Sequence, residues 1–347
     1  MAKQKYLANF LEQMPDFVFD FVQNYYDGDS INTQLAYCID IRIFLNFLSA
    51  RKFKNKSLED FTSEDLNTIT VDDLVNFRAY LREYTIKTTT CDGREVNRTV
   101  KNSNYGINRK LSTVRSLFAY LYKTDKITQN ITDKLDFTNI KQKIKKPLTT
   151  QETIRLLDVI FNGEKYYTGR DLTEYTNRKL RDVALYTAYL GTGVRVSELV
   201  NLNISDISFD TSSFVVTRKG GEEQEIFMPV QVENELYNYI QWRKAFNAED
   251  KDALFISRLG KRITVAAVEK NLKKYCYTVD IIHPDKTRPH ALRRTFACRL
   301  LEDGVDIKMV AELMGHKNIE VTHRFYAQYS SKARKEIMRS FEVIREE

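Results

Sequence analysis

The sequence predicts a mainly α-helical protein of two domains, the second of which is mixed α/β with a small antiparallel sheet. Three observations lead to this prediction. A chain of 347 residues is long enough for two domains. Apolar residues recur at helical spacing over most of the chain, and one alternating stretch with a Gly-Gly turn interrupts them. A basic segment that contains a proline separates the two parts.

The first part, residues 1–139, reads as a set of helices. Ser30 is placed to cap a long helix from Ile31 to Arg51, and shorter apolar stripes predict helices over residues 71–84 and 104–123. The polar, glycine-containing segment TTTCDGREVNRTVKN, residues 88–102, predicts a loop.

The segment IKQKIKKPL, residues 140–148, predicts an exposed basic linker. In the second part, residues 149–347, the alternating segment 207–230 turns at Gly220–Gly221 and predicts a hairpin or small sheet. We expect helices around it, one after Thr150 and the others over residues 178–190, 232–246, 265–277, 289–301, 307–314 and 331–344.

Composition restricts the class of protein. A formal net charge of +7 suits a polyanionic partner, although 54 basic against 47 acidic residues also describes an ordinary charged surface. The four cysteines are scattered and form no CxxC pair, which argues against a zinc site or a disulfide framework and favours a reducing compartment. We see no signal peptide and no apolar run of about 18 residues. We therefore expect a cytoplasmic protein.

Two stretches carry arginines in a pattern that suggests chemistry. In GTGVRVSELVNL, residues 191–202, Arg195 stands at the start of a helix with Glu198 one turn on. In RPHALRRTFACRLLEDG, residues 288–304, His290 and Arg293 lie one turn apart on one face. Taken alone, the first is typical of a surface ion pair and the second of a structural pair.

A third stretch, MGHKNIEVTHRFYAQ, covers residues 314–328. Gly315 ends a helix, His316 follows it, and Tyr326 comes ten residues later. A single tyrosine among 20 would ordinarily be a core residue.

Taken together, the three stretches resemble the tyrosine recombinase (phage integrase) family, and the resemblance runs from about Leu148 to the end. The segment GTGVRVSELVNL resembles the family's first box, and HALRRTF with MGHKNIEVTHRFY resembles its second. The helical first part is similar to the family's core-binding domain, of the SAM-like kind. The opening LEQMPDFVFDFV is similar to the single-protein Xer-type recombinases.

This resemblance implies a catalytic set with a supporting acidic residue, namely Arg195, Lys219, His290, Arg293, His316 and Tyr326 with Glu198. Arg195 and Arg293 would hold the scissile phosphate, and Tyr326 would be the nucleophile. Lys219 would protonate the leaving 5′-oxygen. Strand register decides whether Lys219 or its neighbour Arg218 points inward.

The two histidines would assist proton transfer and contact the phosphate, with His290 as the base and His316 as a hydrogen-bond donor. Two positions depart from the family pattern. Arg294 stands where many members have His, and Met314 replaces the usual Leu. Neither position carries the core chemistry.

Phosphodiester cleavage explains why these residue types occur together. A phenol with a reference pKa near 10 is a poor nucleophile. Guanidiniums relieve the phosphoryl charge with forked donors that stay charged. No carboxylate cluster with metal-ligand spacing accompanies the motifs, so we expect neither a metal nor another cofactor.

The resemblance also implies partners. We expect duplex DNA with a specific recombination site, a homotetramer on two duplexes, and a nucleoid-associated bacterial enzyme. Residues 331–344 would form a helix that is exchanged between protomers. Candidate DNA contacts are the basic residues of the third helix and the linker, namely Arg109, Lys110, Arg115, Lys141, Lys143 and Lys145.

Several alternative functions stay open. The recombinase would serve chromosome dimer resolution, with its link to chromosome segregation and cell division, or the DNA integration and excision of a transposon or phage. A type IB topoisomerase shares the chemistry, and a DNA-binding regulator would explain only the charge. His283, His323 and Tyr329 fall outside the pattern and are expected to be structural or surface residues.

Overall fold

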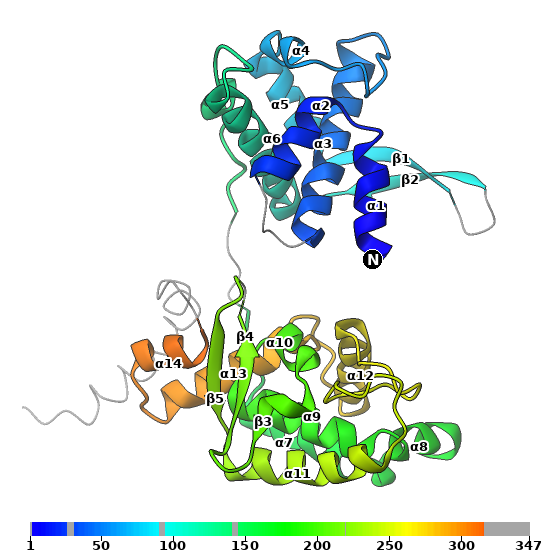
Figure 1. The fold of residues 1–347 in the computed structure, drawn as a ribbon, viewed down its shortest axis with the longest axis vertical. Helices are drawn as coiled ribbons and strands as arrows, with labels where there is room; N and C mark the ends of the chain where they lie inside the picture. Colours follow the sequence, from blue (N-terminus) through cyan, green and yellow to red (C-terminus); the bar gives the residue numbers. More distant parts are fainter. Residues whose placement is uncertain (1, 26–30, 90–93, 141–144, 219, 316–347) are drawn as a thin grey trace, which may run out of the picture. The chain divides into compact units, whose positions relative to one another are not determined.

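The computed structural model describes residues 2–25, 31–89, 94–140, 145–218 and 220–315. The chain divides into two compact units, Met1–Gln142 and Lys143–Glu347 (Figure 1). Among the described residues, no helix combines the length and the apolar character that a membrane crossing requires.

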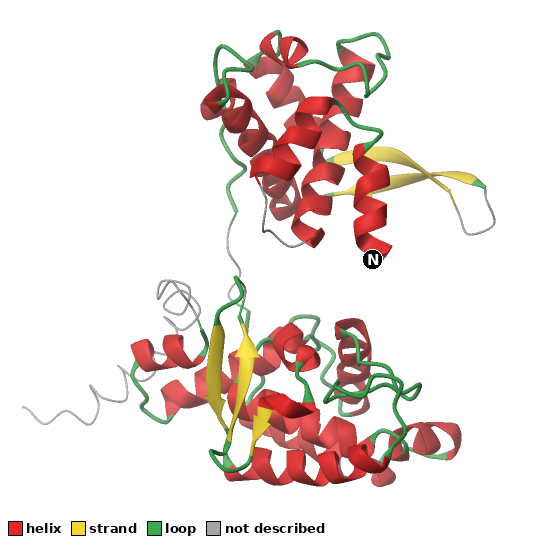
Figure 2. Cartoon of the chain, viewed as in Figure 1, coloured by secondary structure: helices red, strands yellow, loops and turns green. Residues whose placement is uncertain are grey.

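The first unit consists mainly of helices, as predicted (Figure 2). These are α1 (Ala2–Leu11), α2 (Asp16–Asp20), a π-helix (Phe21–Tyr25), α3 (Ile31–Arg51), α4 (Ser63–Asn67), α5 (Val71–Tyr80), α6 (Asn104–Lys123) and a 3-10 turn (Ile131–Lys134). The predictions for α3 and α6 are confirmed at both ends. The predicted cap of α3, Ser30, lies outside the described residues.

Aromatic side chains join the long helices of this unit. The ring of Phe44 on α3 meets Phe77 of α5 edge-on, with 4.9 Å between the ring centroids. It meets Phe118 of α6 in the same manner at 6.2 Å. All three side chains are fully buried. Edge-to-face pairs at these separations add to the free energy of burial itself, so the centre of this unit lies where the three helices meet.

The loop prediction for residues 88–102 is wrong. Strands β1 (Glu83–Thr89) and β2 (Glu95–Lys101) pair antiparallel through seven residue pairs. Tyr84 and Val100 lie opposite each other near one end of the ladder and pack against the helical core. Repeated Thr and Val residues favour an extended backbone, and this preference outweighs the polar, glycine-containing composition. The hairpin also ends α5 at Tyr80, earlier than predicted.

The second unit is mainly helical with one small sheet. Its helices are α7 (Thr150–Phe161), α8 (Gly169–Thr176), α9 (Lys179–Thr192), α10 (Val196–Asn201), α11 (Val230–Ala245), α12 (Val265–Thr278), α13 (Pro289–Glu302) and α14 (Ile307–Leu313), with 3-10 turns at Gly163–Lys165 and Ile204–Asp206. The antiparallel strands β3 (Ile207–Ser208), β4 (Ser213–Thr217) and β5 (Glu223–Phe227) lie in that order. The predicted small sheet is therefore confirmed.

Helix α9 forms the centre of the second unit. It packs against α7, α10, α11 and α13, and its residues from Arg181 to Tyr189 are all buried. The Tyr186 hydroxyl donates to the carbonyl of Val268 on α12 at 3.0 Å. A helix that is covered on all sides needs no polar stripe, which explains its apolar sequence.

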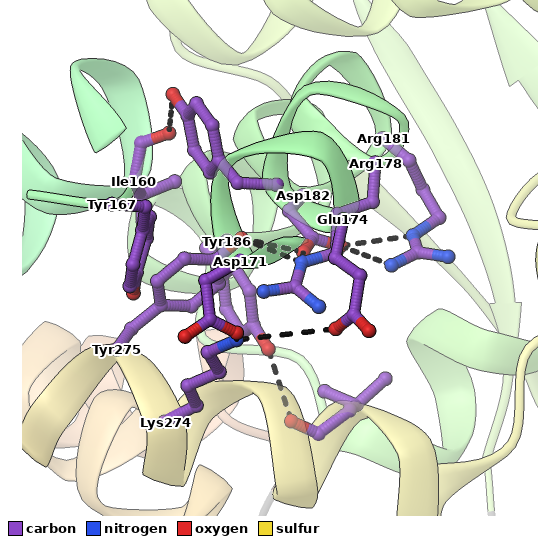
Figure 3. A network of polar contacts seen from close by, with 12 residues as sticks. Ile160, Tyr167, Asp171, Glu174, Arg178, Arg181, Asp182, Tyr186, Lys274 and Tyr275 are labelled. Carbon is purple, nitrogen blue, oxygen red and sulfur yellow. Dashed lines mark hydrogen bonds and ion pairs between the residues drawn. The ribbon is translucent and has the colours of Figure 1, made fainter. Parts of the chain in front are cut away.

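The N-terminal end of α9 is fixed by one buried carboxylate, Asp182. Nε and Nη2 of Arg181 donate to its Oδ1 at 2.9 and 2.6 Å, and the Tyr275 hydroxyl of α12 donates to its Oδ2 at 2.8 Å. Figure 3 shows these side chains, with Arg178, pointing toward the carboxylate. A satisfied buried network rigidifies the elements that share it, so α9 is held firmly relative to α12.

The end of the predicted linker differs from its prediction. Leu148 is buried among the apolar residues of the second unit, and its N–H donates to Oγ1 of Thr295 at 2.9 Å. Lys145 is exposed, as expected, whereas residues 141–144 lie outside the described residues. The segment therefore ends as a packed part of the second unit.

Candidate active site

The first candidate arginine follows the break between α9 and α10. Gly193 has a φ of +62°, and a Cβ there would lie 2.2 Å from the ring of Phe296, so both backbone and packing require glycine. Arg195 then precedes α10. Its N–H donates to Oε2 of Glu198 at 2.7 Å, and its Nη1 donates to Oε1 at 2.7 Å. The expected ion pair is present, with its carboxylate buried.

Glu198 is ionised at neutral pH. Burial acts to raise the pKa of this carboxyl, but the N–H and guanidinium of Arg195 and the guanidinium of Arg218 donate to the charged form. Their combined effect places the pKa below its ordinary value of 4.5. The carboxylate is therefore a fixed negative charge that orients the arginines around it.

Arg218 points into this cluster. On β4, Phe214 and Val216 are buried while Val215 and Thr217 are exposed, and Arg218 continues the buried row just beyond the strand. Its Nη1 donates to Oε2 of Glu198 at 2.7 Å. The sequence alone does not decide whether Arg218 or Lys219 points inward. In the structure the Arg218 side chain points inward, and Lys219 lies outside the described residues.

Arg293 of α13 is 4% exposed and ends among backbone carbonyls. Its Nη1 donates to the carbonyl of Gly193 at 2.7 Å, and its Nη2 donates to the carbonyl of Met314. Burial, followed by the charge of Arg195, lowers the pKa of Arg293 to about 10. The guanidinium thus stays charged at pH 7.

His290 lies one turn before Arg293 and is exposed. Partial desolvation lowers its pKa below the ordinary 6.5, and the positive charges of Arg293, Arg294, Lys145 and Arg195 lower it further. The imidazole is therefore mainly neutral at pH 7, the form that accepts a proton.

The three arginines meet at the end of α14. The carbonyl of Gly315 accepts from Nη2 of Arg195 at 3.2 Å, one residue after the carbonyl that binds Arg293. Gly315 has a φ of +60°, and a Cβ there would lie 2.7 Å from Cζ of Arg218. Two guanidiniums thus bond Glu198, and the third, Arg293, interacts with it electrostatically, so these four side chains carry two positive charges in excess. Such a cluster suits a phosphate, whose oxygens accept from several fixed donors.

Three members of the predicted catalytic set lie outside the described residues. They are Lys219, His316 and Tyr326. Lys219 directly follows Arg218, and His316 directly follows Gly315. The predicted helix 331–344 lies outside the described residues as well. The roles of these residues stay predictions.

The predicted DNA contacts of α6 already have partners within the first unit. Nη1 and Nη2 of Arg109 donate to the two oxygens of Asp40 at 2.5 and 2.8 Å. The Lys110 amine is buried and donates to Oδ1 of Asn102 at 3.0 Å. Arg115 donates to two backbone carbonyls. Each residue thus has a structural role, and its contact with DNA stays a prediction.

The described residues also bear on metal binding and thiol chemistry. No group of three or more His, Cys, Asp or Glu side chains in this part of the chain is placed to hold a metal ion. Cys38 and Cys276 are buried free thiols, and Cys298 is buried as well. Burial raises the pKa of Cys38 and Cys276 to about 12, so neither is a ready nucleophile.

Comparison with known proteins identifies the family. Residues 169–332 match the phage integrase family. The tyrosine recombinase XerC of Caldanaerobacter subterraneus subsp. tengcongensis is 30% identical over 300 residues, which are 84% of this chain and 77% of that protein. The tyrosine recombinase XerS of Streptococcus thermophilus is 29% identical over 354 residues, 92% of this chain and 95% of that protein.

Two groups of solved structures share the fold. The Tn1549 transposon integrase in complex with transposon right-end DNA is 22% identical with a TM-score of 0.65, over 93% of this chain and 98% of that one. The XerH recombinase bound to its difH substrate is 19% identical with a TM-score of 0.60, over 88% and 78%.

The chain belongs to the phage integrase family of tyrosine recombinases. It is thus an enzyme of DNA strand transfer, and its relatives include Xer recombinases.

Proposed function

We propose that this chain is a site-specific recombinase that cleaves and rejoins duplex DNA through a 3′-phosphotyrosine intermediate and a Holliday junction, in an Xer-type role in chromosome dimer resolution. The observation that carries the proposal is the cluster of Arg195, Arg218 and Arg293 around Glu198. A site with two excess positive charges and donors fixed by the backbone is built to receive a phosphodiester.

Arg195 and Arg293 would hold the scissile phosphate. Both guanidiniums are already oriented, the first by Glu198 and the second by the carbonyls of Gly193 and Met314. Donors that are oriented before the reaction need little reorganisation when charge develops on the phosphoryl oxygens. Their charge would thereby stabilise the pentavalent transition state.

Proton transfer would accompany the attack. His290, neutral at pH 7, would take the proton from the Tyr326 hydroxyl, whose oxygen forms a new bond to phosphorus. The bond to the 5′-oxygen breaks, and Lys219 would protonate this leaving oxygen. His316 would donate a hydrogen bond to the phosphate. A 5′-hydroxyl of another strand then reverses the attack, so neither ATP nor another cofactor is required.

The first unit would act as the core-binding domain, residues 1–139, and the second as the catalytic domain, residues 149–347, with DNA clamped by both. Strand exchange between two duplexes requires four cleavages, so we propose a homotetramer in which residues 331–344 dock on a neighbouring protomer. The DNA complexes of XerH and the Tn1549 integrase support a DNA partner. The enzyme would act on the nucleoid in the cytoplasm of a bacterium.

A mobile-element integrase is the second candidate. The fold shared with the Tn1549 transposon integrase supports it. The match to Xer recombinases over 92% of this chain and 95% of XerS favours chromosome dimer resolution. The two roles differ in substrate, since an Xer enzyme recombines two copies of one chromosomal site whereas an integrase needs element ends.

Suicide DNA that carries the target site tests the nucleophile. Wild-type protein should form a covalent adduct and Tyr326→Phe should form none, because the variant lacks the attacking oxygen. Tyr329→Phe is the matched control and should react like wild type. An adduct with Tyr326→Phe would exclude the assignment.

Reporter plasmids test the biological role. Two inverted-repeat sites from the chromosome of the host should recombine without any element ends present. Recombination that occurs only with transposon or phage ends would instead establish the integrase role.

A further inference from the structure

We propose that Arg218 is a positioning residue of the recombination reaction, which acts on the scissile phosphate through Glu198 and Arg195. This inference rests on the proposed role of Arg195 in binding that phosphate. It assigns to Arg218 a function separate from the general acid expected of its neighbour Lys219.

The contact with Glu198 shows how Arg218 would act. Oε2 of Glu198 accepts from Nη1 of Arg218 and from the N–H of Arg195, while Oε1 accepts from Nη1 of Arg195. All three donor–acceptor distances are 2.7 Å. Arg218 therefore fixes the rotation of the carboxylate, and the carboxylate fixes the plane of the Arg195 guanidinium.

The remaining contacts tie Arg218 to two other segments. Its Nε donates to Oε1 of Gln224 on β5 at 2.7 Å, and Nε2 of Gln224 reaches the carbonyl of Glu312 on α14 at 3.4 Å. Its guanidinium lies against Gly315, where no Cβ fits. One planar side chain thus joins the β4–β5 hairpin, α10 and the end of α14.

Each of these three segments leads to a predicted catalytic residue. Lys219 follows Arg218 in the chain, Arg195 shares its carboxylate with Arg218, and His316 follows Gly315. Arg218 is 8% exposed, so it holds these segments from within the protein. Of these three residues, Arg195 is the one that shares a hydrogen-bonded partner with Arg218, so the effect of Arg218 on the reaction passes through Arg195.

Arginine is needed at this position because of its geometry. The planar guanidinium of Arg218 donates from Nε to Gln224 and from Nη1 to Glu198 at the same time. A lysine has a single nitrogen and would keep the charge beside Glu198 while it loses the contact with β5. A methionine of similar length would leave Glu198 with Arg195 alone.

A double-mutant cycle with Arg195 tests the inference. The measurements are single-turnover cleavage of suicide DNA by the full-length protein, its affinity for the same DNA, and its thermal unfolding. Arg218→Met should slow cleavage by about 100-fold, the scale on which small misplacements of catalytic groups act. Affinity for DNA should change by less than about threefold, because the substitution leaves in place the exposed Lys and Arg residues that would contact the DNA phosphates. Arg218→Lys should recover part of the rate.

The cycle separates positioning from general folding. If Arg218 acts through Arg195, the double variant Arg195→Ala/Arg218→Met should be no slower than Arg195→Ala. Arg243→Met is the control, since Arg243 is another buried arginine, which donates to carbonyls of residues 250, 251 and 253. It should lower the unfolding temperature while the cleavage rate of the folded protein stays at the wild-type value.

The outcomes distinguish the positioning role of Arg218 from the proposed role of Arg195 in binding the phosphate. Wild-type cleavage by Arg218→Met, or a double variant that is slower by the product of the single effects, would overturn the positioning role and leave the proposed function intact. Normal cleavage by Arg195→Ala would instead overturn the proposed role of Arg195. If Arg218→Met fails to fold, Arg218→Lys carries the same cycle.

Discussion

Two buried carboxylates, one in each unit, are both held by arginine, yet their pKa values move in opposite directions. Burial raises the pKa of Asp40 in the first unit, and Arg109, Lys110 and Thr113 only partly offset it. The pKa of Glu198 in the second unit is lowered, because donors from Arg195 and Arg218 outweigh burial.

The difference lies mainly in the hydrogen-bond donors, since three donors from Arg195 and Arg218 outweigh burial at Glu198 whereas burial outweighs the donors at Asp40. The side chain of Arg109 is about half exposed, whereas that of Asp40 is fully buried. Around Glu198 the guanidiniums of Arg218 and Arg293 are buried as well, and they exceed the negative charge. Removal of one partner of a buried ion pair leaves an uncompensated charge, which destabilises the protein. The first cluster is therefore structural, while the second carries excess positive charge that suits a further anion.

Removal of Arg293 should give the largest effect and test the unbalanced cluster directly. Arg293→Ala should slow single-turnover cleavage by about 10²–10³-fold, because one fixed donor to the transition state is lost. Affinity for DNA, measured by gel shift, should change much less. Cleavage within about threefold of wild type would mean that the excess charge has no catalytic use.

Removal of Arg109 should affect stability and leave the chemistry unchanged. Arg109→Met leaves the buried Asp40 carboxylate without its bidentate donor, and we expect a loss of about 1–3 kcal/mol in urea unfolding. The loss is moderate because Thr113 still donates to Asp40. Asp40→Asn in the same chain should recover part of it. A cleavage defect in the folded Arg109→Met protein would contradict the assignment of this pair as structural.

Two glycines with positive φ provide a smaller test. Gly315→Ala brings a Cβ to 2.7 Å from the Arg218 guanidinium, whereas Gly304 has a φ of +84° and nothing within 4 Å. Both variants carry the backbone strain of about 1–2 kcal/mol, but only Gly315→Ala displaces Arg218. Cleavage by Gly315→Ala should be about tenfold slower than by Gly304→Ala. Equal rates would mean that contact with Arg218 does not matter.

The smallest expected effect is a pair of opposite pH dependences. The pKa of Glu198 is depressed in the folded state, so its stabilisation is present above 4.5 and is lost as pH falls through the folded value. The pKa of Asp40 is raised, so the folded state loses relative stability as pH rises from 3.8 through the folded value.

Urea unfolding between about pH 3 and 6 measures both effects. The advantage of wild type over Glu198→Gln should shrink toward acid, and the advantage over Asp40→Asn should grow. Slopes of the same sign would mean that the two carboxylates do not differ in this way.

The helices and the small sheet could be predicted from the sequence because their signals are local. The apolar stripes of α3 and α6 and the Gly-Gly turn of the hairpin lie within short windows. The β1–β2 hairpin was missed because its strands are mostly polar, and only pairing along the whole length reveals them. In β1 apolar residues alternate only at Tyr84 and Ile86, and β2 is exposed along most of its length, so the alternation is too short to predict a strand pair.

The contacts of the candidate site also fall into two kinds, those that are local in sequence and those that depend on the fold. Arg195 and Glu198 are neighbours in a helix, so their pairing was predictable. The position of Arg218 was not, because it depends on the exit of the chain from β4 and on contacts with Gln224 and Gly315. The bond from Leu148 to Thr295 likewise joins residues far apart in sequence. Such contacts are set by tertiary packing, and no short motif encodes them.

The excess charge at the end of α14 also has a consequence for the stability of the protein without DNA. Without DNA, the guanidiniums of Arg195, Arg218 and Arg293 repel one another, and this repulsion lowers the stability of the second unit. A phosphodiester bound as proposed would remove the repulsion, and saturation of the site would raise the folded population by mass action. We therefore expect protein without DNA to unfold, and to be cleaved by proteases, more readily than protein on its DNA.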